Sequence, residues 1–312
     1  MRFNPKARLD RGQIQNRRGS GGAGGIGFPT GGGGSGMKVG GGIGGVIVLI
    51  LIFVISQYAG GGSIPPGSFP QSDSGPVSTG GEELSHCRTG QDANEDPDCA
   101  RLAVVNSIQA FWADALPEQS ARQYTEADTV IFSGRVGTQC GAASAQVGPF
   151  YCPVDQQVYL DTTFFQDMLE GQLGGRGGDF AEAYVLAHEY GHHVQNLLGI
   201  MGRVRTQQGA TSDAVRLELQ ADCLAGMWAR YATEVEDERG EVFVQNLTQQ
   251  DIEEALDAAR AVGDDRIQQR SSGRVDPDAW THGSAEQRMH WFTVGRQKGT
   301  LEACDTFDAR QL

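Results

Sequence analysis

Residues 187–195 read AHEYGHHVQ and carry the strongest signal in this 312-residue chain. Within them, His188, Glu189 and His192 fit the pattern His-Glu-x-x-His. Helical residues four apart lie above one another, so both imidazoles can reach one ion. Zinc accepts two histidines and a carboxylate and keeps a fourth position open, and Glu189 beside that face can take a proton from the attacking water. The pattern predicts a metal-dependent hydrolase. It also arises by chance, so two ordinary histidines on a solvated helix remain the alternative.

The surrounding segment, about 180–198, is predicted to be one helix. Asp179 can cap its start, and Glu182 can complete a capping box. Gly191 lies in the middle, where glycine costs about 1 kcal/mol relative to alanine, so we expect a neighbouring backbone to approach closely there. His193 points about 100° away from the preceding histidine, and we interpret it as structural.

A second helix, predicted over 213–231, supplies the missing ligand. Glu218 and Asp222 are again four residues apart and stand among apolar neighbours. Two buried carboxylates are costly unless they are paired or bound to a metal. Glu218 would therefore complete a site of two histidines and one glutamate, and Asp222 would accept the ring N–H of a ligand histidine. The alternative is that Glu218 pairs with Arg216 on the surface.

A third group of polar residues lies at 281–288, THGSAEQR. Ser284 and Gln287 can cap a helix that runs to about residue 296. His282 precedes this helix and Arg288 lies one turn inside it, so the two could stabilise the oxyanion formed at a scissile carbonyl. On the residues alone, a surface histidine beside a helix start is the commoner explanation.

The N-terminal quarter of the chain differs from the rest in composition. Residues 1–38 are Gly-rich and basic, which predicts a disordered cytoplasmic tail. Residues 39–59, VGGGIGGVIVLILIFVISQYA, carry no charge and match the roughly 20 residues that cross a bilayer core. We expect an uncleaved transmembrane helix there; a buried core helix or a cleaved signal peptide are the alternatives. Residues 60–81 are predicted to be a Gly/Pro/Ser linker, and residues 82–312 the folded domain.

The charges around the span predict its orientation. Basic residues crowd the segment before it, and none follows until Arg88, so the N-terminus is expected in the cytoplasm and the domain in the periplasm or outside the cell. The net charge of −14 is concentrated in the domain. An acidic domain argues against nucleic acid as a partner, and a well-solvated surface is the simplest interpretation.

Six cysteines agree with an exported domain, because disulfides persist in oxidising compartments. Six cysteines allow fifteen pairings. Spacing along the chain favours two local pairs and leaves a third: Cys87–Cys99 and Cys140–Cys152, then Cys223–Cys304. Six reduced cysteines remain the alternative if the orientation is inverted. The chain has no Cys-x-x-Cys pair, so a cysteine zinc site is not expected.

The apolar pattern predicts an α+β fold. A helical stripe covers about 98–115 and stops near Pro117, residues 129–132 form a strand, and 140–161 form extended segments with turns. Beyond residue 179 the pattern is mainly helical. A small sheet should therefore precede the helix of the first motif.

Three strings together resemble the bacterial family of neutral zinc metallopeptidases: HEYGHHVQNLLG at 188–199, LELQADCLAGMWA at 217–229 and HGSAEQRMHWF at 282–292. The likeness extends to GPFYCP at 148–153, AVGDDRIQ at 261–268 and the basic start with its single span. That family is similar to the gluzincins, in which Glu-x-x-x-Asp follows His-Glu-x-x-His.

The resemblance implies roles for particular residues. It implies zinc ligation by His188, His192 and Glu218, with Glu189 as the general base and Asp222 beside the ligands. The later histidine with an arginine six positions on is similar to a motif of membrane-associated gluzincins, which implies transition-state and structural roles for His282 and Arg288. Gly283 stands where that motif has proline.

Taken together, we expect a zincin-like domain that binds Zn²⁺ and hydrolyses a peptide or protein substrate, held at the membrane by one N-terminal helix. An edge strand within 147–161 could align an extended peptide. A catalytically silent, metal-binding scaffold is the main rival, and a Glu189→Gln variant would distinguish the two. A structural anchor with a chance motif would leave Glu218 and Asp222 unexplained.

Overall fold

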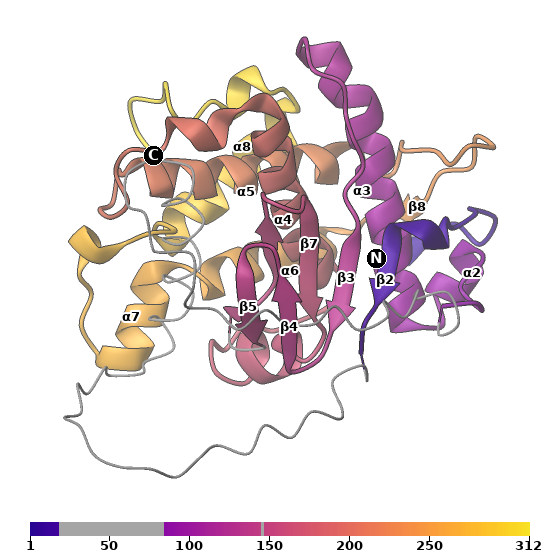
Figure 1. Cartoon of the computed structure of the whole chain (residues 1–312), viewed down its shortest axis with the longest axis horizontal. Helices are drawn as coiled ribbons and strands as arrows, with labels where there is room; N and C mark the ends of the chain where they lie inside the picture. Colours follow the sequence, from indigo (N-terminus) through magenta and orange to yellow (C-terminus); the bar gives the residue numbers. More distant parts are fainter. Residues whose placement is uncertain (19–83, 145–146) are drawn as a thin grey trace.

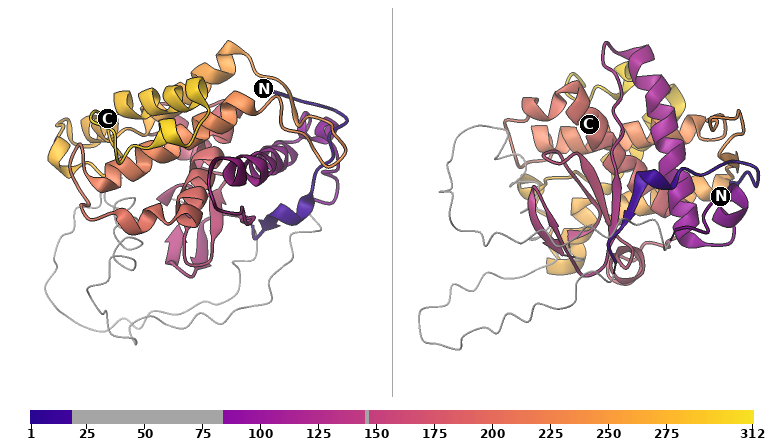
Figure 2. Two further views of the ribbon diagram at one scale, coloured as in Figure 1. Left: turned by 90° about the horizontal axis from the view of Figure 1, so that it is seen from above. Right: turned by 45° about the vertical axis from the view of Figure 1, so that its right-hand side comes forward.

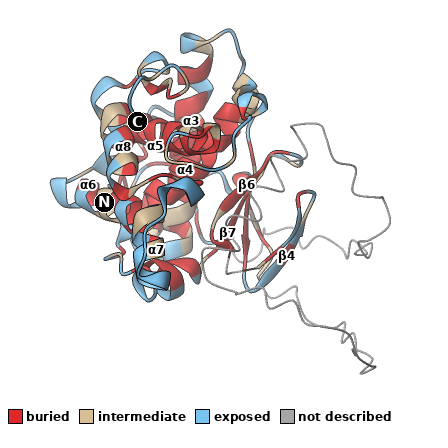
Figure 3. Cartoon of the chain, turned by 90° about the vertical axis from the view of Figure 1, so that its left-hand side faces the viewer, coloured by how far each residue is buried: buried red, intermediate tan, exposed pale blue. Residues whose placement is uncertain are grey.

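The computed structural model describes residues 1–18, 84–144 and 147–312, and they form the predicted mixed α+β fold. Figure 1 labels these elements, and the view in Figure 3 shows the helices gathered on one side and the strands on the other. The predicted transmembrane segment 39–59 and the linker 60–81 lie outside the described residues. Within the part that is described, no helix is long and apolar enough to span a bilayer.

A four-stranded mixed sheet forms one layer, and its strands lie in the order β2, β3, β7, β6. The first three are parallel, and β6 runs antiparallel to β7 at the edge. A hairpin of β4 and β5 follows β3, and β1 pairs separately with β8. The bounds are β1 Arg2–Phe3, β2 Ile14–Asn16, β3 Thr129–Phe132, β4 Arg135–Thr138, β5 Gly141–Ser144, β6 Phe150–Cys152, β7 Gln157–Asp161 and β8 Val244–Asn246.

The helices form the other layer, with α4 at its centre. Helix α4 packs against α3, α5 and α6, and α8 lies alongside α5 (Figure 2). Their bounds are α2 Gly90–Ala93, α3 Pro97–Gln119, α4 Asp179–Leu198, α5 Asp213–Tyr231, α6 Gln249–Ala261, α7 Asp264–Ser272 and α8 Ala285–Lys298. Short helical turns are η1 Arg11–Gln13, η3 Phe165–Glu170, η4 Ile200–Arg203, η5 Pro277–Ala279 and η6 Glu302–Cys304.

The observed helix boundaries show which predictions of helix ends from the local sequence were correct. The capping box of Ser284 and Gln287 is present at the start of α8, as predicted. The cap predicted for Asp179 is wrong, because Gly178 occupies the N-cap position of α4. The backbone N–H of Phe180 donates instead to the carboxylate of Glu254, a residue of helix α6, at 3.2 Å. Helix α3 passes Pro117 and ends at Gln119.

Gly191 allows α4 and α5 to approach each other closely. A β-carbon at this position would lie 3.0 Å from the carbonyl oxygen of Ala221 and 3.1 Å from its α-carbon. Real side chains rarely tolerate such contacts with backbone atoms of a packed helix. The glycine predicted to mark a close backbone approach therefore lies between the two ligand histidines, where the helices cross.

All three predicted disulfides are present: Cys87–Cys99, Cys140–Cys152 and Cys223–Cys304. The last of them ties α5 to the C-terminal turn η6 across 81 residues.

The prediction of a disordered segment over residues 1–38 is wrong for residues 1–18. These residues supply β1, η1 and β2, and β2 extends the main sheet in parallel to β3. Four of their apolar side chains are buried in the main core: Phe3, Ala7, Leu9 and Ile14. The glycines that follow dominate the average composition and hide this short apolar pattern. The folded domain therefore includes residues 1–18 together with the described residues from 84 onward.

Candidate metal and catalytic site

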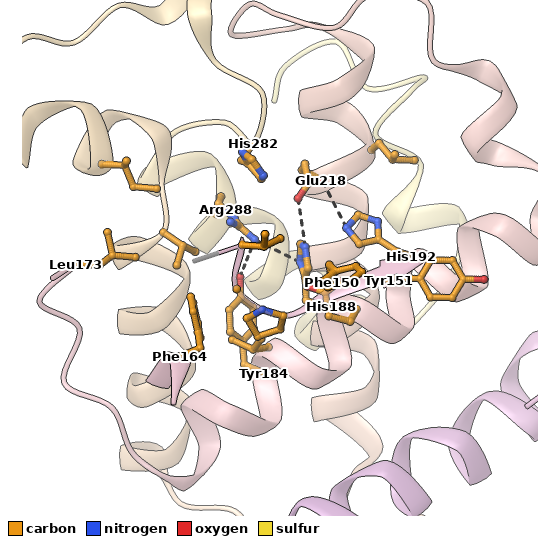
Figure 4. Close-up of a pocket in the computed structure, with 18 of the residues that line it drawn as sticks. Phe150, Tyr151, Phe164, Leu173, Tyr184, His188, His192, Glu218, His282 and Arg288 are labelled. Atoms are coloured by element: carbon orange, nitrogen blue, oxygen red, sulfur yellow. Dashed lines mark hydrogen bonds and ion pairs between the residues drawn. The ribbon is translucent and has the colours of Figure 1, made fainter. Parts of the chain in front are cut away.

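His188 and His192 lie one turn apart on α4, and Glu218 faces them from α5 (Figure 4). The Nε2 atom of His188 is 3.2 Å from Glu218 Oε2, and His192 Nε2 is 3.4 Å from Glu218 Oε1. Tetrahedral zinc with bonds of about 2.0–2.1 Å separates its donors by roughly 3.3–3.4 Å. The spacing therefore fits one ion of this kind, and the three buried side chains form a group that can hold a metal.

A further hydrogen bond orients each histidine ring. Asp222 Oδ1 lies 2.8 Å from His188 Nδ1, and Gln195 Oε1 lies 2.8 Å from His192 Nδ1. Both partners are oxygen acceptors, so each Nδ1 carries a proton and each Nε2 faces Glu218. The rings are thus held ready to ligate.

Charge also prepares the site for a cation. Burial alone would lower the pKa of His188, but Asp222 and Glu218 raise it to about 9. Burial would likewise raise the pKa of Glu218, yet His192, His282 and His188 hold it well below its usual range. Without an ion, a proton on His188 takes the place of the metal. Proton and metal therefore compete, and metal affinity should weaken as the pH falls.

Asp222 is buried completely between two further side chains. Arg288 donates through Nε to Oδ2 at 2.8 Å and through Nη2 to Oδ1 at 2.9 Å, and the Tyr184 hydroxyl donates at 2.5 Å. Burial would raise the pKa of Asp222, but Arg288 and His188 lower it to about 2. The carboxylate is therefore ionised, and the arginine is fixed in place by a bidentate bond.

Glu189 is buried in the wall of the cavity that also contains the three metal donors. Burial raises the pKa of Glu189, and the two neighbouring histidines offset only part of this effect. A carboxylate with a raised pKa can take up a proton and return it near neutral pH. Its position beside the donors suits a general base.

His282 lines the same cavity from the loop before α8, and Asp264 holds that loop. Asp264 Oδ2 accepts the backbone N–H groups of Thr281, His282 and Gly283 at 2.7, 2.7 and 3.1 Å. Burial would lower the pKa of His282, but Glu218 and Asp264 raise it. Gly283 has a φ of 94°, which proline cannot adopt, so this loop differs from the resembling motif with proline.

His193 points away from the metal donors. Its Nε2 donates to the Thr125 carbonyl at 2.6 Å, and its Nδ1 accepts from the Tyr151 hydroxyl at 3.0 Å. Burial lowers the pKa of His193. The side chain therefore joins α4 to β6 as a neutral bridge, which is the structural role expected for it.

One other group among the described residues has metal-ligating atoms within reach of one another: His86, Cys87, Asp96 and Cys99. Its two sulfur atoms are joined in a disulfide. Only a histidine and a carboxylate remain as donors, and both are part-exposed, so this group is not a second metal centre.

The sequence of the whole chain matches the family described as "Putative neutral zinc metallopeptidase" over residues 1–307. The chain belongs to this family. It is 56% identical over 234 residues to the uncharacterised protein Rv2575 of Mycobacterium tuberculosis (strain H37Rv), which covers 74% of this chain and 78% of the relative. It is also 37% identical over 332 residues to the uncharacterised protein YpfJ of Escherichia coli (strain K12), and this alignment covers 98% of this chain and 99% of the relative. No solved structure matches the chain.

Three residues of this candidate site were missed in the sequence: Tyr184, Gln195 and Asp264. Tyr184 lies one turn before the first ligand and Gln195 three residues after the second, so helical spacing alone could have indicated both. Asp264 belongs to the string AVGDDRIQ, which carried the resemblance but had no assigned role. Its contact with the His282 loop depends on tertiary packing.

Proposed function

We propose that this neutral zinc metallopeptidase hydrolyses peptide bonds with water and that its metal is zinc. One observation carries the proposal: three metal donors and an uncoordinated, buried glutamate share one cavity. Zinc bound there would act as a Lewis acid and make water more acidic. Family membership and the donor spacing support zinc as the ion.

The protein's own side chains would then move the protons and stabilise charge. Glu189 takes the proton of the attacking water and gives it to the leaving amine. His282, whose pKa is raised, donates a hydrogen bond to the carbonyl oxygen as negative charge develops. Arg288 keeps Asp222 ionised and in place, and Asp222 in turn orients His188.

Strand β6 offers a way to align the substrate. It is one of the two edge strands of the described sheet, and two of its residues, Phe150 and Tyr151, line the cavity. An extended peptide can add to such an edge through backbone hydrogen bonds. The substrate is accordingly a peptide or an unfolded protein segment.

We further propose that the domain works outside the cytoplasm. Three disulfides support an oxidising compartment. Attachment to a membrane through residues 39–59 is part of the same proposal and rests on the sequence alone.

The decisive experiment combines metal analysis with a single substitution. Purified full-length protein should contain about one zinc per chain and should digest a peptide library until a chelator is added. Glu189→Gln should keep the zinc and lose roughly 10²–10⁴-fold in turnover. Glu182→Gln is the matched control, because Glu182 lies on the same helix but pairs with Arg101. A metal-loaded protein whose turnover is unchanged by Glu189→Gln, or that digests nothing, would instead be a binding scaffold.

A further inference from the structure

The cavity that contains the metal donors is lined largely by apolar side chains. Its volume is about 150 Å³. A cavity of roughly this size, lined by aliphatic and aromatic side chains, is large enough to bind benzene. The space therefore matches one large apolar side chain, such as leucine or phenylalanine.

Polar and apolar side chains both line this cavity. The polar ones are the metal donors with Glu189, His282 and Arg288. The apolar ones come from segments far apart in the sequence: Phe150, Phe164, Leu173, Val185, Val262 and Ile267. Phe164 and Leu173 mark the apolar end of the cavity. Phe164 and Leu173 lie on the opposite side of Arg288 from His192 (Figure 4).

The charged groups of the cavity other than Glu189, which is the proposed general base, already have partners. Arg288 is bonded to Asp222 and Tyr184, and Glu218 faces the two ligand histidines. A charged substrate side chain would lose its hydration without gaining a dedicated partner. An apolar side chain has no such hydration to lose, and it would gain contacts with the apolar lining on several sides.

We infer that the apolar end of the cavity is a side-chain subsite, and that the substrates are peptides with a leucine- or phenylalanine-sized apolar residue beside the cleaved bond. This inference rests on the proposed function, because the metal donors mark where the bond must lie. The segment AVGDDRIQ at 261–268 therefore contributes both to the subsite and to the position of the His282 loop. Val262 and Ile267 line the subsite, and Asp264 between them holds the His282 loop.

Amino-acid hydroxamates test the subsite without catalysis, because the hydroxamate binds zinc and places one side chain next to it. We expect calorimetric dissociation constants for the zinc-loaded full-length protein to fall about fourfold per buried carbon, hence roughly 50-fold from alanine to leucine hydroxamate. Lysine and glutamate hydroxamates should bind no better than alanine hydroxamate. Equal affinities across the series, or tightest binding of a charged member, would overturn the inference and leave the zinc peptidase intact. Failure of every hydroxamate to bind would remove both.

Two substitutions should shift the preference in opposite directions. Ile267→Ala enlarges the subsite, so the affinity for phenylalanine relative to leucine hydroxamate should rise roughly fourfold or more. Val262→Phe fills the space from a half-buried position, so the advantage of leucine over alanine should shrink. Ile252→Ala is the matched control: Ile252 is similarly buried, at 5% against 8% exposed for Ile267, but does not line the cavity. If the subsite lay elsewhere, the order of hydroxamate affinities would be the same in all three variants.

Discussion

A single carboxylate, Asp264, holds three successive backbone N–H groups of the His282 loop and lies 3.5 Å from the Nδ1 atom of that histidine. The backbone contacts fix where the loop lies, and the negative charge raises the pKa of the ring. Substitution can separate these two effects, because asparagine retains an acceptor oxygen but carries no charge.

Asp264→Asn should lower kcat about 10-fold and leave KM nearly unchanged, a smaller loss than the 10²–10³ typical of deleting an oxyanion donor. Asp264 raises the pKa of His282, so loss of its charge should let the ring deprotonate at lower pH. The high-pH limb of the kcat/KM profile should therefore move to lower pH. Asp276→Asn is the control, since Asp276 also accepts a backbone N–H, that of Asp278, but none of the His282 loop. An unmoved limb would mean that Asp264 only shapes the loop.

At the scale of elements, the geometry of the site depends on how closely α4 and α5 approach. Each helix alone carries an i, i+4 pair, but only their contact brings Glu218 to the histidines. Gly191 lies at that contact, beside Ala221 of α5. A methyl group there would push apart the two helices that share the metal.

Gly191→Ala should therefore weaken metal binding and lower stability, although alanine favours the helix by about 1 kcal/mol. Overpacking typically costs about 1–3 kcal/mol, so the net loss should be near ~1 kcal/mol, measurable by urea unfolding of the metal-free protein. Zinc competition against a chromophoric chelator should show a raised Kd. Gly202→Ala is the control, because nothing lies within 4 Å of a β-carbon there, and its effect should stay within about 0.5 kcal/mol. Equal behaviour of the two variants would refute the close-contact explanation.

The same elements explain which parts could be predicted from sequence. Helical periodicity indicated the candidate site because His188, His192, Glu218 and Asp222 are paired within single helices. Local spacing indicated two of the disulfides and left the third. The cap of α4 could not be predicted, because Glu254 reaches it from a distant helix. The order of the strands was equally hidden, since β2 joins the sheet from the far N-terminus and its pairing depends on residues more than a hundred positions away.

At the scale of the whole molecule, residues 1–18 are as much part of the domain as helix α4. Strand β2 pairs with β3 at one edge of the sheet, and Phe3 and Ile14 are buried in the main core. Two segments of one sheet cannot lie on opposite sides of a bilayer, because their hydrogen bonds and core contacts require direct contact. The predicted orientation, with a cytoplasmic N-terminus and an external domain, would require β2 to leave this sheet, so the sheet pairing and the charge pattern make opposite predictions about where residues 1–18 lie.

Cysteine labelling tests this consequence directly. The six native cysteines are paired in disulfides, so a cysteine placed at Lys6 or at Asp114, both exposed, would be the reactive thiol. Intact cells that make full-length Lys6→Cys or Asp114→Cys should be labelled equally by a membrane-impermeant maleimide, since both positions share one compartment. If that compartment is oxidising, both should react without lysis. Labelling of Asp114→Cys alone would support the orientation predicted from charge. It would mean that β2 leaves the sheet in the cell, and the exposed edge of β3 would then need another strand to cover it.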